Sequence, residues 1–87
     1  MLNNTGGWEI RFTQAARRHR IGRASARHVM AGAEPTPVST RGGADAWLYS
    51  GPDERGRDLE IIAVEVHPAE AVPYLLVIHV MPTQLRG

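Results

Sequence analysis

Arginine and histidine side chains are concentrated in one stretch of the sequence that has no carboxylate. From Arg11 to Met30 the chain has six arginines and two histidines, and it has no aspartate or glutamate there. The chain has ten arginines and no lysine, so every basic side chain is a planar guanidinium. A guanidinium binds phosphate or carboxylate groups through paired hydrogen bonds. The stretch therefore predicts an anion-binding surface, formed by Arg17, Arg18, Arg20, Arg23 and Arg27.

The near-neutral total charge conceals this separation of signs. The formal net charge is +1, but residues 10–33 contribute +6 and the remainder contributes −5. Surface helices normally carry both signs. We therefore favour a surface for RNA or for an acidic partner over the simpler alternative, a solvated helix face that binds nothing.

Cleavage of RNA by attack of the 2′-hydroxyl needs a base, an acid and cations near the phosphate. The candidate proton carriers are His19, His28, His79, Glu60 and Glu65, and of these His79, Glu65 and His19 are preferred. His79 interrupts an apolar segment, so it is either a hydrogen-bonded core histidine or a catalytic group. Glu65 is either the ion-pair partner of a helical arginine or a general base. His19 falls on the expected apolar helix face, where packing is the alternative to catalysis.

The remaining polar and aromatic residues point less clearly to a site. Glu60 and Glu65 are an odd number of positions apart, so they project to opposite faces of a regular strand. Trp47 and Tyr49 share a face, where they either stack on bases or form one side of a thin core, the reading that we favour. His28 and His67 are expected to be structural or exposed. Cysteine is absent and no histidine pair has helical zinc spacing, so we expect neither a metal nor another cofactor.

The pattern of apolar residues predicts the elements that would position these groups. Residues 8–12 alternate as in a half-buried strand. Helices are expected at 14–20 and 23–32, with Gly22 as the N-cap of the second and Ile21 packing on Ala26. A single helix over the whole segment is less favoured, because Ile21 would then point away from the apolar face of that helix. Further strands are expected at 46–50, 59–66 and 74–81, after a loop rich in proline and glycine.

This order predicts an α+β fold in one domain of 87 residues. An N-terminal strand is followed by two short helices and then by a three-stranded antiparallel meander, with the helices on one face of the sheet. Residues 1–7 are expected to be a flexible tail and 84–87 a frayed end. The last two strands are apolar on both faces, and the helices cover only one of them. A partner chain, or a second copy in a homodimer, would cover the other face.

The same segments resemble a known family. A strand that ends in "FT", then "A-x-R-H-x-I", "Y-x-G" and "GRxLEIIAVE…LLVIHVM" resemble the BrnT-like proteins of the RelE-type toxin superfamily, over about residues 8–83. The resemblance implies a small antiparallel sheet packed by an N-terminal helical pair. It also implies the toxin of a two-gene toxin–antitoxin module, which cleaves RNA and is neutralised by an antitoxin.

Together these observations predict a metal-independent endoribonuclease toxin whose partners are RNA and a cognate antitoxin. The alternative is a small module without catalytic activity, whose basic helices dock an acidic protein. No apolar run approaches the roughly 20 residues of a membrane span. The first residues also lack the features of a secretory signal. We therefore expect a cytoplasmic protein that does not associate with a membrane.

Overall fold

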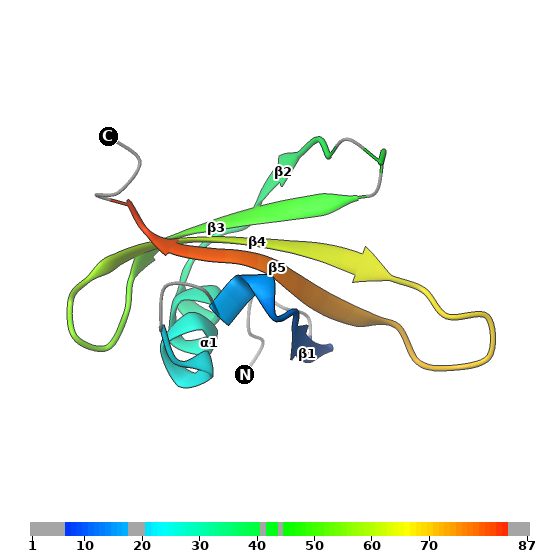
Figure 1. Ribbon diagram of the computed structural model, residues 1–87, viewed down its shortest axis with the longest axis horizontal. Coiled ribbons are helices and arrows are strands. Elements are labelled where there is room, and N and C mark those ends of the chain that lie inside the picture. The colour runs from blue at the N-terminus through cyan, green and yellow to red at the C-terminus, as the bar shows by residue number, and fades with distance from the viewer. Residues whose placement is uncertain (1–6, 18–20, 41, 44, 84–87) are drawn as a thin grey trace.

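The computed structural model describes residues 7–17, 21–40, 42–43 and 45–83 (Figure 1). Its elements follow one another along the chain as strand, 3-10 turn, helix and four further strands. Their bounds are β1 Glu9–Phe12, η1 Ala15–Arg17, α1 Arg23–Gly32, β2 Thr36–Val38, β3 Ala46–Pro52, β4 Asp58–Val66 and β5 Tyr74–Pro82.

All five strands belong to one mixed sheet. The strand order is β1-β5-β4-β3-β2. β1 runs parallel to β5, with Ile10 beside Leu75, whereas β2, β3, β4 and β5 pair as antiparallel neighbours. β1 and β2 therefore lie at opposite edges of the sheet, and the chain between them must cross one sheet face. The 3-10 turn η1 contacts β5 and the helix α1 contacts β3 and β4 during this crossing.

The predicted fold class, two helices followed by a three-stranded meander, is wrong. The described residues form a five-stranded mixed sheet with one α-helix and one 3-10 turn. The proline- and glycine-rich segment predicts a loop with at most a short extended piece at Val38, but Thr36–Val38 pair with β3 as an edge strand, where proline is tolerated. The parallel pairing of β1 with β5 joins residues more than 60 positions apart, and hydrophobic periodicity holds no information about it.

In the described part of the first expected helix, at 14–20, the structure has the 3-10 turn η1. The Thr13 hydroxyl accepts a hydrogen bond from the Ala16 N–H (3.2 Å), and the Arg17 N–H donates to the Gln14 carbonyl (3.1 Å). So short a segment gains too few hydrogen bonds to offset the cost of nucleating an α-helix. Residues 18–20 lie outside the described part of the chain, as do all but Gly7 of the expected tail 1–7 and the whole expected frayed end 84–87.

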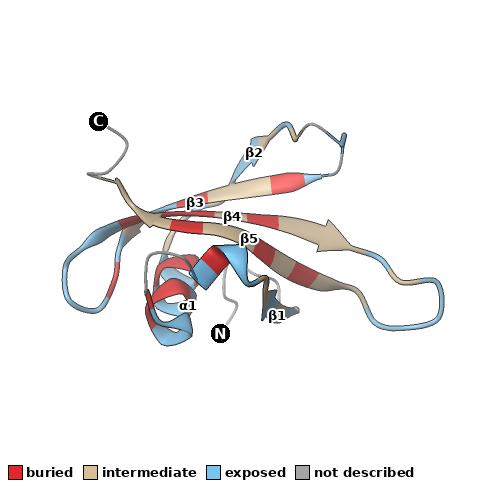
Figure 2. Cartoon of the chain, viewed as in Figure 1, coloured by how far each residue is buried: buried red, intermediate tan, exposed pale blue. Residues whose placement is uncertain are grey.

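The hydrophobic core lies between the crossing segment and one face of the sheet (Figure 2). Val29 and Met30 of α1 are buried there, together with Tyr49 and Ile61, which are register partners on β3 and β4. Leu59 and Ala63 alternate with Ile61 on the same face and are also buried. This core fixes the helix on the sheet and thereby places the N-terminus of α1.

We expect truncation of Met30 to weaken this attachment. Its side chain has no solvent exposure, so Met30→Ala should lower the free energy of unfolding by roughly 2–5 kcal/mol, as cavity-forming core substitutions do. The measurement is chemical denaturation, with Val72→Ala as the control because Val72 is 82% exposed. A loss below about 1 kcal/mol for Met30→Ala would mean that α1 is not anchored as described.

Candidate functional site

A basic hollow lies at the N-terminus of α1. Its volume is about 430 Å³, and it is lined by Arg17, Ile21, Gly22 and Arg23. Ile21 is buried, whereas the other three residues are exposed. Two guanidinium groups therefore flank an opening whose inner wall is a core side chain.

The helix terminus itself adds positive potential to this hollow. Gly22 is the N-cap residue and has extended backbone angles, with no side-chain cap hydrogen bond, and the first turn has no acidic residue. The first N–H groups of a helix have no partner within the helix, and the helix dipole places partial positive charge there. Such a terminus binds anions well, since the N–H groups and the dipole favour the same charge. The expected roles of Gly22 as N-cap and of Ile21 as a packed residue agree with this geometry.

The expected anion surface is only partly assembled in the described residues. Arg17 and Arg23 share the hollow, and neither has an ion pair with a carboxylate among the residues that the structure describes. Arg27 instead points toward β1, where its Nη2 donates to the Ile10 carbonyl (3.4 Å) and its guanidinium lies 5.6 Å from the Phe12 ring centre. Arg18 and Arg20 lie outside the described residues.

Two arginines outside this hollow are neutralised by neighbouring carboxylates. Arg11 pairs with Glu9 at 2.9 Å and lies 3.9 Å from the ring centre of Tyr74. Arg57 pairs with Asp53 at 2.8 Å in the turn between β3 and β4. Burial alone would raise the pKa of Asp53, but the hydrogen bonds from the Arg57 and Arg55 backbones and from the Arg57 guanidinium outweigh it and lower the pKa. These pairs leave Arg17 and Arg23 as the stronger candidates for an external anion.

The structure separates the expected proton carriers from one another. Glu65 follows Ile61 and Ala63 in alternation, so it projects to the face of the sheet that α1 covers. His79 is the register partner of Ile62 and its ring lies 3.7 Å from Glu60, both on the opposite face. Glu65 and His79 therefore cannot act on the same bond. His19, the third candidate, lies outside the described residues.

Glu65 has partners that we did not expect from the sequence. Its Oε2 accepts a hydrogen bond from Trp47 Nε1 (2.7 Å), and its Oε1 lies 3.0 Å from His67 Nε2. The Trp47 hydrogen bond, followed by that of His67, outweighs burial and lowers the pKa of Glu65. The ring of His67 in turn meets the Trp8 ring edge-on, with 5.5 Å between centres. Glu65 and His67 are two positions apart, which puts both on one side of an extended chain, and this spacing could have indicated their contact.

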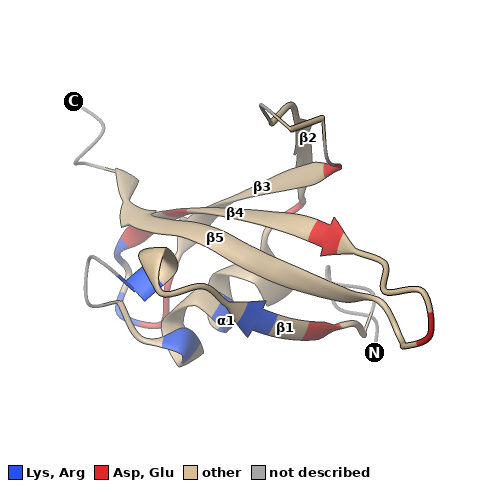
Figure 3. Ribbon diagram, turned by 45° about the vertical axis from the view of Figure 1, so that its right-hand side comes forward, with Lys and Arg blue, Asp and Glu red and all other residues tan. Residues whose placement is uncertain are grey.

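The hollow at the α1 N-terminus and the Glu65 carboxylate consequently occupy different parts of the molecule. In Figure 3 the blue segments of η1 and α1 are on the same side of the view as the β3–β4 turn, where red and blue both occur, whereas the red end of β4 is on the other side. No group of three or more metal-binding side chains occurs among the described residues. Of the helices in that part of the chain, none has the length and apolar character needed to cross a membrane.

The carboxylate of Glu65 can be tested through the tryptophan that contacts it. In a Trp8→Phe background, where Trp47 is the only indole, we expect Trp47 fluorescence to titrate in acid with a midpoint below the ordinary glutamate range. Because its folded-state pKa is lowered, Glu65 adds stability at neutral pH, and this contribution is lost as the pH falls through that pKa. Glu65→Gln should therefore destabilise the protein near pH 7 but not in acid.

The matched control is Glu70→Gln, which removes an exposed carboxylate between β4 and β5. It should leave the fluorescence titration intact, whereas Glu65→Gln should abolish it. A midpoint at or above that of an ordinary glutamate, or a titration that persists in Glu65→Gln, would contradict the assigned contact.

Comparison of the chain with protein-family models, with curated proteins and with solved structures finds no match. Any functional conclusion therefore depends on the geometry and the electrostatics of the two regions described above.

Proposed function

We propose that the protein binds RNA through the hollow at the α1 N-terminus and acts in the cytoplasm as the RNA-cleaving toxin of a toxin–antitoxin module. The observation that supports this most is the pair Arg17 and Arg23, two arginines without carboxylate partners among the described residues, beside a helix N-terminus that lacks a side-chain cap. A cognate antitoxin would block this activity.

The chemistry of the hollow suits a phosphate group. A guanidinium offers two parallel N–H donors to phosphate oxygens, and the helix N-terminus offers backbone N–H donors. The same donors would stabilise the extra negative charge that develops on phosphorus when the 2′-hydroxyl attacks. His19 stands between Arg17 and Ile21 in the sequence, so it is the first candidate to test for proton transfer.

One observation favours the alternative, a binding module without catalysis. The described carboxylates of Glu65 and Asp45 belong to a separate hollow, lined by neither Arg17 nor Arg23. Among the described residues no carboxylate lines the basic hollow, and Glu54 instead accepts a hydrogen bond from Ser25 in the first turn of α1. In this second candidate the same arginines would bind the carboxylates of an acidic protein.

Charge reversal in the hollow tests the binding step. We expect Arg17→Glu/Arg23→Glu to weaken binding of a short single-stranded RNA about tenfold or more, since hydrogen bonds to charged groups contribute roughly 1.5–3 kcal/mol each. Fluorescence anisotropy at fixed ionic strength is the measurement, because phosphate contacts depend strongly on salt. The control Arg55→Glu reverses an exposed charge in the β3–β4 turn and should change the affinity little.

A second variant separates a lost ligand from a damaged fold. Gly22→Asp adds a carboxylate that can cap α1, and a Cβ at this position meets no atom within 4 Å. We expect this variant to be at least as stable as the parent protein yet to bind RNA about tenfold more weakly, as its carboxylate competes for the same N–H donors. Unchanged RNA binding in Gly22→Asp and in the charge-reversed protein would overturn the proposed site.

Cleavage is tested separately from binding. The parent protein should cut RNA and arrest growth, and His19→Ala should lose both effects while keeping its affinity for RNA. Retained RNA binding with no cleavage by the parent protein would leave only the binding part of the proposal. If Arg17→Glu/Arg23→Glu lost its binding to an acidic protein without any change in an RNA phenotype, the alternative would be supported.

A further inference from the structure

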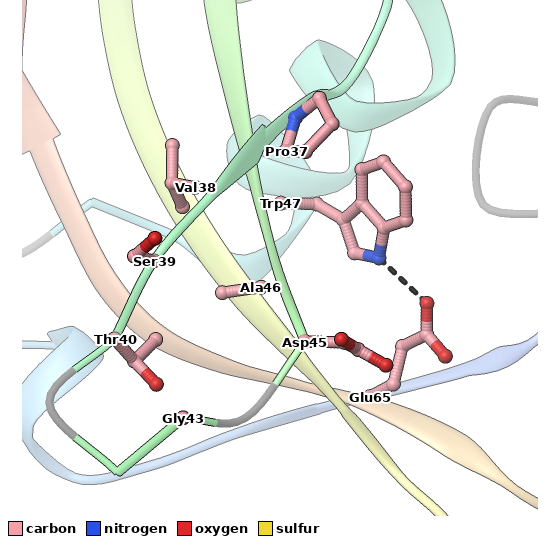
Figure 4. A pocket seen from close by; sticks show the side chains of 9 residues that line it. All are labelled: Pro37, Val38, Ser39, Thr40, Gly43, Asp45, Ala46, Trp47 and Glu65. Atoms are coloured by element: carbon pink, nitrogen blue, oxygen red, sulfur yellow. Dashed lines mark hydrogen bonds between the residues drawn. The ribbon is translucent and has the colours of Figure 1, made fainter.

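A second hollow lies at the opposite, acidic part of the molecule. Its volume is about 500 Å³, and it lies between the β2–β3 connection and the end of β4 (Figure 4). Trp47, Glu65 and Asp45 line it, together with Pro37 and Val38 of β2. The Glu65 N–H donates to the Asp45 carbonyl (3.1 Å), so the backbone holds the two acidic positions next to each other.

The groups in this hollow are held in a defined orientation before any ligand arrives. The Trp47 indole N–H is directed at one oxygen of Glu65, and His67 contacts the other, which restricts rotation of the carboxylate. Trp47 is packed against the core and is only partly exposed, so its ring position is also restricted. In Figure 4 the Asp45 side chain extends toward Glu65. A preorganised carboxylate beside an indole costs little further ordering when it binds a ligand.

We infer that this hollow binds a guanidinium group, the side chain of an arginine in a basic segment of a protein partner. Each carboxylate oxygen has two acceptor positions, so Glu65 retains acceptor capacity beyond its bonds to Trp47 and His67. An indole provides a π surface that attracts cations, and a guanidinium can both stack on it and bond to a carboxylate. Asp45 is exposed and adds negative charge at the rim. Two of the described lining residues are acidic and none is basic, so the charge of the site complements a cation.

The same electrostatics disfavour a nucleic acid at this position. A phosphate in the hollow would meet the lowered-pKa carboxylate of Glu65, which stays charged at neutral pH. The inference is independent of the RNA proposal, because the two hollows share no lining residue. Arg17→Glu/Arg23→Glu should therefore leave the arginine site unchanged.

A peptide titration tests the site. In the Trp8→Phe background, acetyl-Gly-Arg-Gly-amide should shift the Trp47 indole N–H resonance with a dissociation constant on the order of 1 mM, typical of one small group. Acetyl-Gly-Glu-Gly-amide should cause no shift, and acetyl-Gly-Lys-Gly-amide should bind more weakly than the arginine peptide. Glu65→Gln should weaken arginine binding about fivefold or more, because the charge-assisted bond becomes a neutral one. Its amide oxygen can still accept the Trp47 hydrogen bond.

Two further variants keep the result interpretable. Asp45→Asn removes a rim charge from an exposed position and should weaken arginine binding about twofold, so it reports on the site even where Glu65→Gln does not fold. Glu70→Gln, outside the hollow, should bind as the parent protein does. Equal binding of the arginine and glutamate peptides, or undiminished arginine binding in both Glu65→Gln and Asp45→Asn, would overturn the inference. So would a Trp47 shift produced by a short RNA instead of the peptide.

Discussion

The parallel pairing of β1 with β5 determines how the rest of this structure is arranged. Because β1 lies at one edge of the sheet and β2 at the other, the residues between them must cross a whole sheet face. They cross as η1 against β5 and as α1 against β3 and β4. The helix buries Val29 and Met30 in doing so, which leaves its N-terminus, with Arg23, at the surface beside Arg17 of the preceding turn. The basic hollow is thus a direct consequence of the crossing.

The crossing also explains why the basic hollow and the acidic hollow occupy different parts of a small molecule. The segment that crosses the sheet holds Arg17 and Arg23, whereas Glu65 and Asp45 lie at the end of the sheet near the β2–β3 connection. Each region is complementary to a different ligand, an anion at the helix terminus and a cation beside Trp47. A toxin that binds RNA at one region and a basic partner segment at the other would need this separation, since the two ligands would otherwise compete.

The sequence predicts the local features of this molecule better than its long-range ones. The apolar segments 59–66 and 74–81 indicate strands, and β4 and β5 occupy them. Gly22 marks the start of α1 because Ile21 fits the core only if the helix begins after it. In contrast, the pairing of Ile10 with Leu75 and that of Pro37 with Trp47 depend on contacts between distant segments, which no local pattern encodes.

The candidate sites show the same difference between local features, which the sequence predicts, and long-range contacts, which it does not. The charge pattern indicates the region of Arg17 and Arg23, but it also includes Arg27, whose guanidinium contacts β1 instead. Alternation along β4 predicts that Glu60 and Glu65 project to opposite faces, and the structure has them so. The bond from Trp47 to Glu65 depends on the register between β3 and β4, so the acidic hollow could not be derived from the sequence.

An anion site at the α1 N-terminus is best tested by titrating the ¹⁵N-labelled protein with a short single-stranded RNA. We expect the largest amide shifts at Gly22, Arg23 and Ser25, a strong weakening of binding at high salt, and little change at Trp47 or Glu65. Shifts concentrated at Trp47 and Glu65, or no shifts at the start of α1, would contradict it.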